Sequence, residues 1–264
     1  RIVRDFFSDV CVNHAIDTVF GKNVLQTKLS QHMKTASSDF TFPDTQIITK
    51  RASRLPTTLA GFYLDIVKSD SARATIFWAG DSRCYFLDQT KGLFPVTKDD
   101  QQYEADEFES LKTDSPMSNC ISASGNFTIN LNKFKLRSKT NILIAATDGC
   151  FGYFQTPMHF ELMMLKTLSA SKSISHWQSN IEEQIVKVTQ DDATLAMVAT
   201  GWESFDEIKR AFANRLEETY TKFIKDVDAE NEKIISLKKE LEDRQTHFDK
   251  IKLNAWKKYF SSRK

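Results

Sequence analysis

One stretch does most to decide the fold: Thr75-Ile76-Phe77-Trp78-Ala79-Gly80-Asp81-Ser82-Arg83-Cys84-Tyr85-Phe86-Leu87. Its two halves are rich in β-branched and aromatic residues, which favour strands. Gly80-Asp81-Ser82 between them is typical of a tight turn. The pattern therefore predicts two strands, Ala74–Ala79 and Arg83–Leu87, joined as a β-hairpin.

Segments on both sides of this stretch extend the prediction to a mixed fold. Further strand patterns lie at 57–67, 92–96, 127–136, 141–147 and 193–199. Helix-period apolar positions occur at 2–20, 24–33, 157–168 and 174–188. Helices come first, strands occupy the middle and helices return late. That order favours an α+β fold with antiparallel sheets over an alternating parallel fold.

The composition excludes several classes of protein. Of the 264 residues, 41% are hydrophobic, and 36 basic residues nearly balance 35 acidic ones. A net charge of +1 provides no broad field to attract nucleic acid, so nucleic acid is not expected among the partners. The longest apolar run, Ile142–Ala146, is far shorter than the roughly 18 residues that cross a bilayer, so no membrane span is expected.

The cysteines indicate a compartment. Cys11, Cys84, Cys120 and Cys150 are far apart in the sequence and form no CxxC or Cys/His cluster. This spacing argues against a zinc site and against a dense disulfide framework. We expect thiols in a reducing compartment, which predicts a cytoplasmic protein.

Charge density divides the chain near Gly201. From Trp202 to Lys264, 28 of 63 residues are charged, about twice the density of the preceding part. Such a segment is either a solvated helix or disordered. We therefore predict a globular domain at 1–201 and a charged helical arm at 202–264.

The spacing of apolar residues in the arm favours a helix. They recur at alternating steps of four and three, interrupted only where Glu230 and Arg244 take the expected positions, and the series contains neither Gly nor Pro. Its members are Leu216, Tyr220, Phe223, Val227, Ile234, Leu237, Leu241, Phe248, Ile251 and Ala255. The pattern predicts a coiled coil or helical hairpin at 216–255, which would pair with a second copy or a partner helix. The alternative is an amphipathic helix folded back on its own domain.

Acidic residues lie where the predicted strands begin or end. They are Asp81, the pair Asp99-Asp100, Asp148 beside Gly149, and the pair Asp191-Asp192. Taken singly, each motif is most simply a turn or a cap. Together, they can converge at one end of a sheet, where carboxylates are costly unless a cation neutralises them. Mg²⁺ and Mn²⁺ take such oxygen ligands, and a neighbouring Gly lets its backbone carbonyl approach the ion.

Five motifs occur in order over about 56–199. They are Pro56-Thr57-Thr58-Leu59, Gly80-Asp81-Ser82-Arg83, Phe94-Pro95-Val96-Thr97-Lys98-Asp99-Asp100, Thr147-Asp148-Gly149 and Asp191-Asp192-Ala193-Thr194. Each is weak alone, but the order and content of the set resemble the metal-dependent protein phosphatases of type 2C. The resemblance implies a two-layer antiparallel β-sandwich flanked by helices, with a phosphoserine or phosphothreonine protein as substrate.

The same resemblance implies a metal site and a reaction. Two Mg²⁺ or Mn²⁺ ions would lower the pKa of a shared water, which then attacks phosphorus in line. Carried over residue by residue, Asp148 and Asp191 would be metal ligands, and Gly149 would contribute its carbonyl oxygen. Asp99 matches the acidic residue that holds a third ion. Asp81 and Arg83 of the predicted hairpin are expected to be supporting structure.

The sequence also departs from the family pattern. The family's first metal-binding Glu-Asp, its phosphate-gripping Arg and its Asp-Gly-x-Gly-Gly loop precede the first helix, and none of them is present in the sequence. Asp100 stands where a His is usual. The missing segment has either been left out of a chain that starts at Arg1, or is naturally lacking, in which case the protein is a pseudophosphatase that binds without hydrolysing. We favour the enzyme because Asp99, Asp148 and Asp191 are retained together; a helical interaction protein anchored by its globular part is a third possibility.

Overall fold

The structure is a computed structural model. It describes residues 3, 6–7, 22–38, 55–68, 71–101, 106–112, 116–136 and 140–263. The chain forms two compact units, Arg1–Leu216 and Glu217–Lys264.

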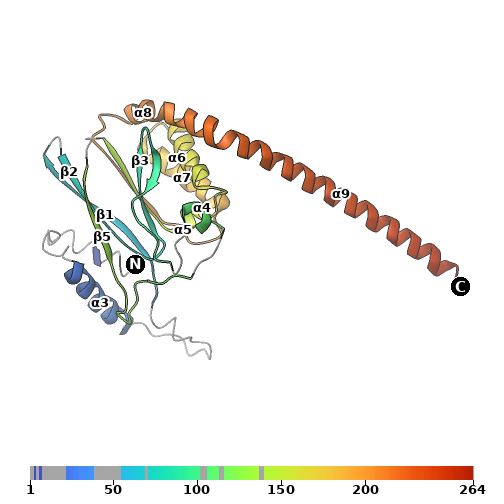
Figure 1. Cartoon of the computed structure of the whole chain (residues 1–264), viewed down its shortest axis with the longest axis horizontal. Coiled ribbons are helices and arrows are strands. Elements are labelled where there is room, and N and C mark those ends of the chain that lie inside the picture. Colours follow the sequence, from blue (N-terminus) through green and yellow to red (C-terminus); the bar gives the residue numbers. More distant parts are fainter. Residues whose placement is uncertain are drawn as a thin grey trace. The chain divides into compact units, whose positions relative to one another are not determined.

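The first unit contains two antiparallel sheets (Figure 1). A three-stranded sheet has the order β1-β2-β5, with β1 at Leu59–Lys68, β2 at Ser71–Ala79 and β5 at Asn130–Leu136. A four-stranded sheet has the order β4-β3-β6-β7, with β4 at Gly92–Pro95, β3 at Arg83–Asp88, β6 at Asn141–Ala146 and β7 at Leu195–Thr200. The predicted α+β class with antiparallel sheets is confirmed.

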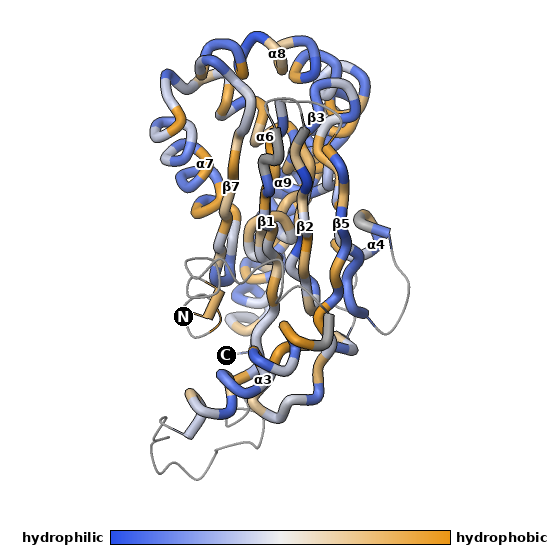
Figure 2. The backbone as a smooth tube through the Cα atoms, turned by 90° about the vertical axis from the view of Figure 1, so that its left-hand side faces the viewer, coloured by the Kyte–Doolittle hydropathy of each residue, from blue (hydrophilic) through white to orange (hydrophobic). Residues whose placement is uncertain are grey.

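The two sheets pack face to face around a shared core. Ile76 of β2, Cys84 of β3 and Leu143 of β6 belong to one cluster of buried side chains. Successive residues of a strand point to opposite faces, so the neighbouring side chains of these strands serve the outer faces of the sandwich. In β6 five of the six residues are buried, as its nearly all-apolar sequence predicted. Hydrophobic residues also occupy much of β7 (Figure 2).

Helices cover both outer faces. Helix α3 (Lys22–Ser38) buries Leu25 and Leu29 in a cluster with Phe77 of β2, on the outer side of the three-stranded sheet. Helices α6 (Pro157–Ala170) and α7 (Ile174–Val188) bury the outer side of the four-stranded sheet (Figure 1). The result is a β-sandwich flanked by helices.

The predicted hairpin around Gly80 is wrong. Strand β2 pairs with β1 and β5, whereas β3 pairs with β4 and β6, so Gly80-Asp81-Ser82 joins the two sheets. Gly80 has a φ of 92°, a conformation that residues with a side chain rarely adopt. Its backbone N–H donates to Asp100 Oδ2 at 3.0 Å, and Thr58 and Ser82 share a hydroxyl hydrogen bond of 2.7 Å. These bonds fix the passage from one layer to the other.

The helices begin at the residues that their capping chemistry indicates. Thr156 and Ser173 are the N-caps of α6 and α7, and their hydroxyls accept backbone N–H bonds. Two short helices, α4 (Glu107–Ser110) and α5 (Asp148–Phe151), were not predicted. The helix predicted at 2–20 lies outside the described residues, apart from three positions that are helical.

Helix α8 (Phe205–Glu218) explains why the first unit ends after Leu216 and not after Gly201. Ile208 and Phe212 are buried in the same cluster as α6 and α7. Arg215 Nε donates to Glu161 Oε1 of α6 at 2.6 Å, and both side chains are almost fully buried. These contacts tie the start of the charged segment to the sandwich.

The second unit is helical up to Ser261. A π-helix, η2 (Thr219–Ile224), leads into α9 (Lys225–Ser261), which has 37 residues and none buried. In η2 the N–H of Lys225 reaches the carbonyl of Tyr220, so the wider turn shifts the helical phase and the predicted heptad series is not continuous across it. The long helix is confirmed. In the described part of the chain, no helix combines the length and the apolar character that crossing a membrane requires.

Substitution of Glu161 by Gln tests the buried pair. The change leaves the Arg215 charge buried without its counter-charge, so we expect the free energy of unfolding to fall by roughly 3–5 kcal/mol. The matched control is Glu183→Gln, which removes an exposed pair with Lys187 and should leave stability nearly unchanged. Urea denaturation measures both. Equal, small losses would show that Arg215 does not depend on Glu161.

Candidate metal centre

Two motifs that are distant in sequence meet at one end of the four-stranded sheet. Thr147 follows β6 and Thr194 precedes β7. The N–H of Thr147 donates to the Thr194 carbonyl at 3.0 Å, and the Thr147 hydroxyl accepts the N–H of Thr194 at 2.9 Å. Gly149 packs so closely against the Asp192 backbone that a Cβ there would overlap the Asp192 carbonyl oxygen. The Asp148 and Asp191 segments are therefore locked together by backbone contacts.

Both predicted ligands of these segments are exposed to solvent. Asp148 is the first residue of α5, and its Oδ1 accepts the N–H of Gly149 at 3.0 Å. Asp191 lies in the loop before β7, and its Oδ1 accepts the N–H of Asp192 at 2.7 Å. Since exposed carboxylates retain access to the solvent, both can be reached by a cation.

Asp81 joins this acidic end from the turn after β2. Its pKa is raised from 3.8 to about 6, mainly by burial and also by the negative charges of Asp148 and Asp99, against opposing effects of its own backbone and of Arg83. These effects require the three carboxylates to be near one another. The sequence had indicated Asp81 only as supporting structure; its position at the end of a strand was the signal that could have placed it in the site.

Asp99 forms a buried ion pair with Arg83. Arg83 Nε donates to Oδ1 at 2.9 Å and Nη2 to Oδ2 at 2.7 Å, and the side chains are 6% and 11% exposed. Burial acts to lower the pKa of Arg83, but the hydrogen bonds and charge of Asp99 raise it above its ordinary value. The guanidinium also lies 4.5 Å from the centre of the Phe151 ring. Asp99 is the residue predicted to hold a third ion, and both of its carboxylate oxygens accept hydrogen bonds from Arg83.

Asp100 holds the turns around the site together. Its carboxylate accepts the N–H of Gly80, the amide of Asn119 at 2.6 Å and the amide of Asn130 at 2.9 Å. It connects the β2–β3 passage with the segment before β5. Asp100, where the family pattern has a His, serves here as a hub of hydrogen bonds, and no sequence signal indicated this role.

The donor chemistry fits a divalent cation in part. Among the residues that the structure describes, no three His, Cys, Asp or Glu side chains are grouped to hold a metal ion. What the acidic end offers is the carboxylates of Asp81 and Asp148, with Asp191 on the adjoining segment and the backbone of Gly149, all hard oxygen donors. Mg²⁺ is commonly held by one or two carboxylates and otherwise by water or phosphate oxygens. Burial and the charges of Asp148 and Asp99 both raise the pKa of Asp81, and such a cation would offset the part that comes from charge.

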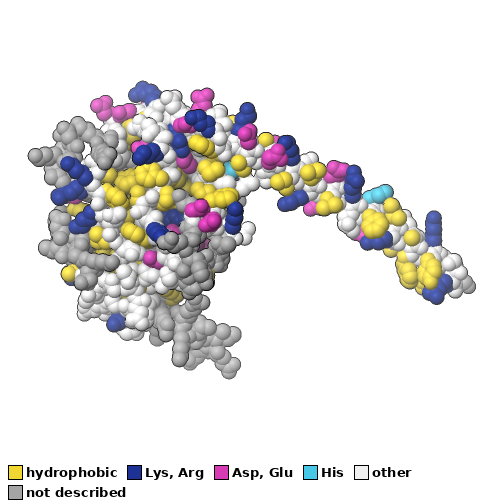
Figure 3. Space-filling view, viewed as in Figure 1, with side chains coloured by type: hydrophobic (Ala, Val, Ile, Leu, Met, Phe, Trp, Pro, Cys, Tyr) yellow, Lys and Arg dark blue, Asp and Glu magenta, His cyan; other side chains and the backbone are white. Residues whose placement is uncertain are grey.

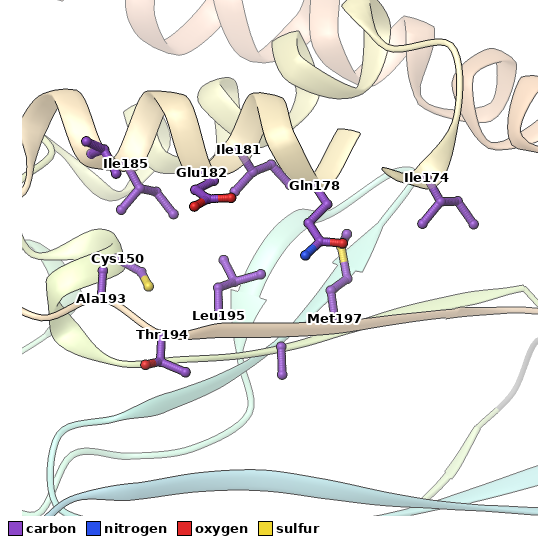
Figure 4. A pocket seen from close by; sticks show the side chains of 12 residues that line it. Cys150, Ile174, Gln178, Ile181, Glu182, Ile185, Ala193, Thr194, Leu195 and Met197 are labelled. Atoms are coloured by element: carbon purple, nitrogen blue, oxygen red, sulfur yellow. The ribbon is translucent and has the colours of Figure 1, made fainter. Parts of the chain in front are cut away.

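A cavity of about 620 Å³ adjoins this end of the sandwich (Figure 4). It lies between α7 and β7, where Gln178, Ile181 and Ile185 face Leu195 and Met197. Its lining is largely apolar and includes no carboxylate of the acidic end. The cavity is therefore a separate apolar space beside the candidate metal centre.

Comparisons with known proteins identify similar solved structures. No protein-family model and no curated protein matches the chain. The serine/threonine phosphatase Stp1 from Staphylococcus aureus is 13% identical, with 72% of this chain and 69% of that chain covered and a TM-score of 0.49. Bacterial serine/threonine phosphatases are among the similar structures. PppA, a component of the type VI secretion system of Pseudomonas aeruginosa, is 15% identical over 68% of this chain and 70% of that chain (TM-score 0.45).

The catalytic domain of the serine/threonine phosphatase PstP, solved in complex with two manganese ions, is 16% identical. The match covers 68% of this chain and 70% of that chain, with a TM-score of 0.44. The function proposed for this chain rests on its own motifs and contacts.

Asp81→Asn tests the electrostatics of the acidic end. Between pH of about 4 and 6, native Asp81 keeps a proton that the unfolded chain has lost, so stability falls as the pH rises through this window. Asn does not ionise. In the presence of a chelator, the variant should melt roughly 2–4 °C above the wild type at pH 7.5, with the difference vanishing near pH 4. A pH-independent difference would contradict the raised pKa.

Asp99→Asn separates the two roles open to this carboxylate. Asp99 is the buried partner of Arg83, so its substitution by Asn should lower the free energy of unfolding by roughly 3–5 kcal/mol in metal-free buffer. Asp65→Asn, which removes the more exposed pair with Arg73, is the control and should cost less than about 1 kcal/mol. An unchanged stability combined with weaker Mn²⁺ binding would instead show that Asp99 serves mainly as a metal ligand.

Proposed function

We propose that the first unit is a metal-dependent phosphatase that hydrolyses phosphoserine and phosphothreonine in proteins. The observation that carries this proposal is the meeting of the Asp148 and Asp191 segments at one end of the sandwich, with Asp81 close enough for its pKa to be raised. Carboxylates kept together at an energetic cost are characteristic of functional sites. The order of the five sequence motifs supports phosphate-ester hydrolysis as the reaction.

The residues have distinct proposed roles. Asp148 and Asp191 would hold Mg²⁺ or Mn²⁺ ions with the carbonyl oxygen of Gly149, and Asp99 would contact a third ion if released from Arg83. Bound divalent ions supply an acidified water and neutralise charge on phosphoryl oxygens. The chain's own contribution is to position these oxygens: the bonds between Thr147 and Thr194 fix the spacing of the two ligand segments.

The second unit supplies an interaction surface in this proposal. Helix α9 presents large apolar side chains to solvent, among them Leu237 and Leu241, which are 64% and 66% exposed. We propose that the arm mediates oligomerisation or docks a partner. Cys84 and Cys150 are buried free thiols, which supports a reducing compartment such as the cytoplasm.

A second candidate function is phosphoprotein binding without hydrolysis. It is favoured by the engagement of Asp99 with Arg83 and by the lack, among the described residues, of a three-ligand metal group. In that case the acidic end would be a remnant, and the arm would carry the biological role.

Hydrolysis of a phosphopeptide in the presence of Mn²⁺ tests the first proposal. We expect turnover by the full-length natural protein that requires the metal, and a loss of about 100-fold or more in Asp148→Asn, because even residues outside the direct ligand set cost 10–100-fold when they are changed. Initial rates of phosphate release measure both.

The matched control is Asp243→Asn, which alters an exposed carboxylate of α9 and should leave the rate unchanged. An undiminished rate in Asp148→Asn would remove Asp148 from the metal site and the mechanism with it. Saturable phosphopeptide binding by the wild type with no metal-dependent turnover would instead establish the second candidate.

A further inference from the structure

Helix α9 carries a stripe of exposed apolar side chains (Figure 3). Ile234, Leu237, Leu241, Phe248 and Ile251 lie on it, with between 48% and 66% of each exposed. In the described residues of α9 none is buried. Soluble proteins rarely leave a continuous apolar surface of this kind without a partner.

The spacing of the stripe fits a second helix. Steps of four and three residues average 3.5, so the stripe follows a left-handed supercoil. In heptad notation Ile234, Leu241 and Phe248 take position a, and Leu237 and Ile251 take position d. A helix carrying the same spacing can therefore pack along the whole stripe.

Two charged residues in the stripe distinguish the possible orientations. Glu230 and Arg244 both take position d, two heptads apart. In a parallel pair of identical helices, each would face its own copy, and like charges would meet at the interface. In an antiparallel pair centred near residue 236, Glu230 of one helix lies within a turn of Arg244 of the other. Opposite charges then lie near each other twice, once on each side of the two-fold axis.

The flanking positions favour the same orientation. Lys233 and Glu240 both take position g. In a parallel pair Lys233 would face Lys238 of the second helix, another repulsive contact. In the antiparallel pair Lys233 faces Glu240, and Asp226 faces His247. Parallel pairing thus places like charges together where antiparallel pairing places opposite ones.

Ion pairs within each helix already hold these charged side chains at the positions that antiparallel pairing uses. Within one helix, Lys233 Nζ lies 2.7 Å from Glu230, and Arg244 Nη2 lies 2.7 Å from Glu240. Antiparallel pairing joins the Glu230–Lys233 pair of one helix to the Glu240–Arg244 pair of the other, with charges alternating in sign. Networks of several charges contribute more to stability than isolated exposed pairs do.

The apolar residues are compatible with this register. Ile234 of one copy then packs against Leu237 of the other, and the contact occurs twice about the two-fold axis.

We propose that α9 pairs with α9 of a second copy of this chain, antiparallel, about an axis near residue 236. This deepens the interaction role given to the arm under the proposed function. It does not depend on hydrolysis by the first unit, so assays of assembly and of phosphate release can fail separately.

Disulfide cross-linking between two differently sized versions of the full chain tests the orientation. One version carries Asp226→Cys and the other His247→Cys. These positions adjoin in the antiparallel pair, but in a parallel pair they are about 31 Å apart along the helix. We expect the mixed-size product to dominate after mild oxidation, while the parent chain with its native cysteines gives the background. Products linking only identical versions would establish a parallel pair and overturn the proposal.

Charge reversal tests the second copy as the partner. In sedimentation equilibrium, Glu230→Arg and Arg244→Glu should each weaken dimerisation about tenfold, and the double variant should recover most of the loss. Lys239→Glu, at the outward position f, is the matched control and should have little effect. A wild-type monomer at all concentrations would overturn the proposal and indicate that a different protein, or the chain's own first unit, covers the stripe.

Discussion

The half-buried carboxyl of Asp81, placed near other carboxylates, is the constraint on which the functional end of this protein depends. Asp81, Asp99 and Asp148 come from three different parts of the chain, and burial together with the charges of Asp148 and Asp99 raises the pKa of Asp81 to about 6. The fold opposes the repulsion between these charges in two ways. Arg83 neutralises Asp99 within the sandwich, and backbone bonds between Thr147 and Thr194 hold the remaining acidic segments in place. A site assembled at such a cost makes physical sense if a cation binds there.

Much of the architecture could be predicted from local pattern. The strands on both sides of Gly80, the all-apolar β6 and the helices beginning after Thr156 and Ser173 have strong local signals, because burial and capping act on neighbouring residues. The same holds for the long helix of the arm and its Glu240–Arg244 pair. The gathering of acidic residues at strand ends was likewise visible in the sequence.

What could not be predicted depends on contacts between distant residues. A turn of Gly-Asp-Ser is compatible with a hairpin or with a passage between sheets, and the outcome depends on distant contacts: β2 and β3 pair with other strands, and Asp100 accepts the N–H of Gly80. Similarly, no local pattern pairs Arg83 with Asp99, or Glu161 with Arg215, because each partner lies on a different element. The η2 turn interrupts a heptad series that is regular in sequence, so only part of that series remains a straight stripe.

The most direct test of the account is the pKa of the Asp81 carboxyl, followed by carbon NMR in a pH titration with and without Mg²⁺. Without the ion, the account predicts a pKa near 6. With Mg²⁺ it predicts a clear fall, since a cation among the carboxylates favours the charged form. A titration near 4 in both conditions, or one near 6 that Mg²⁺ does not change, would contradict a cation site at this end of the sandwich.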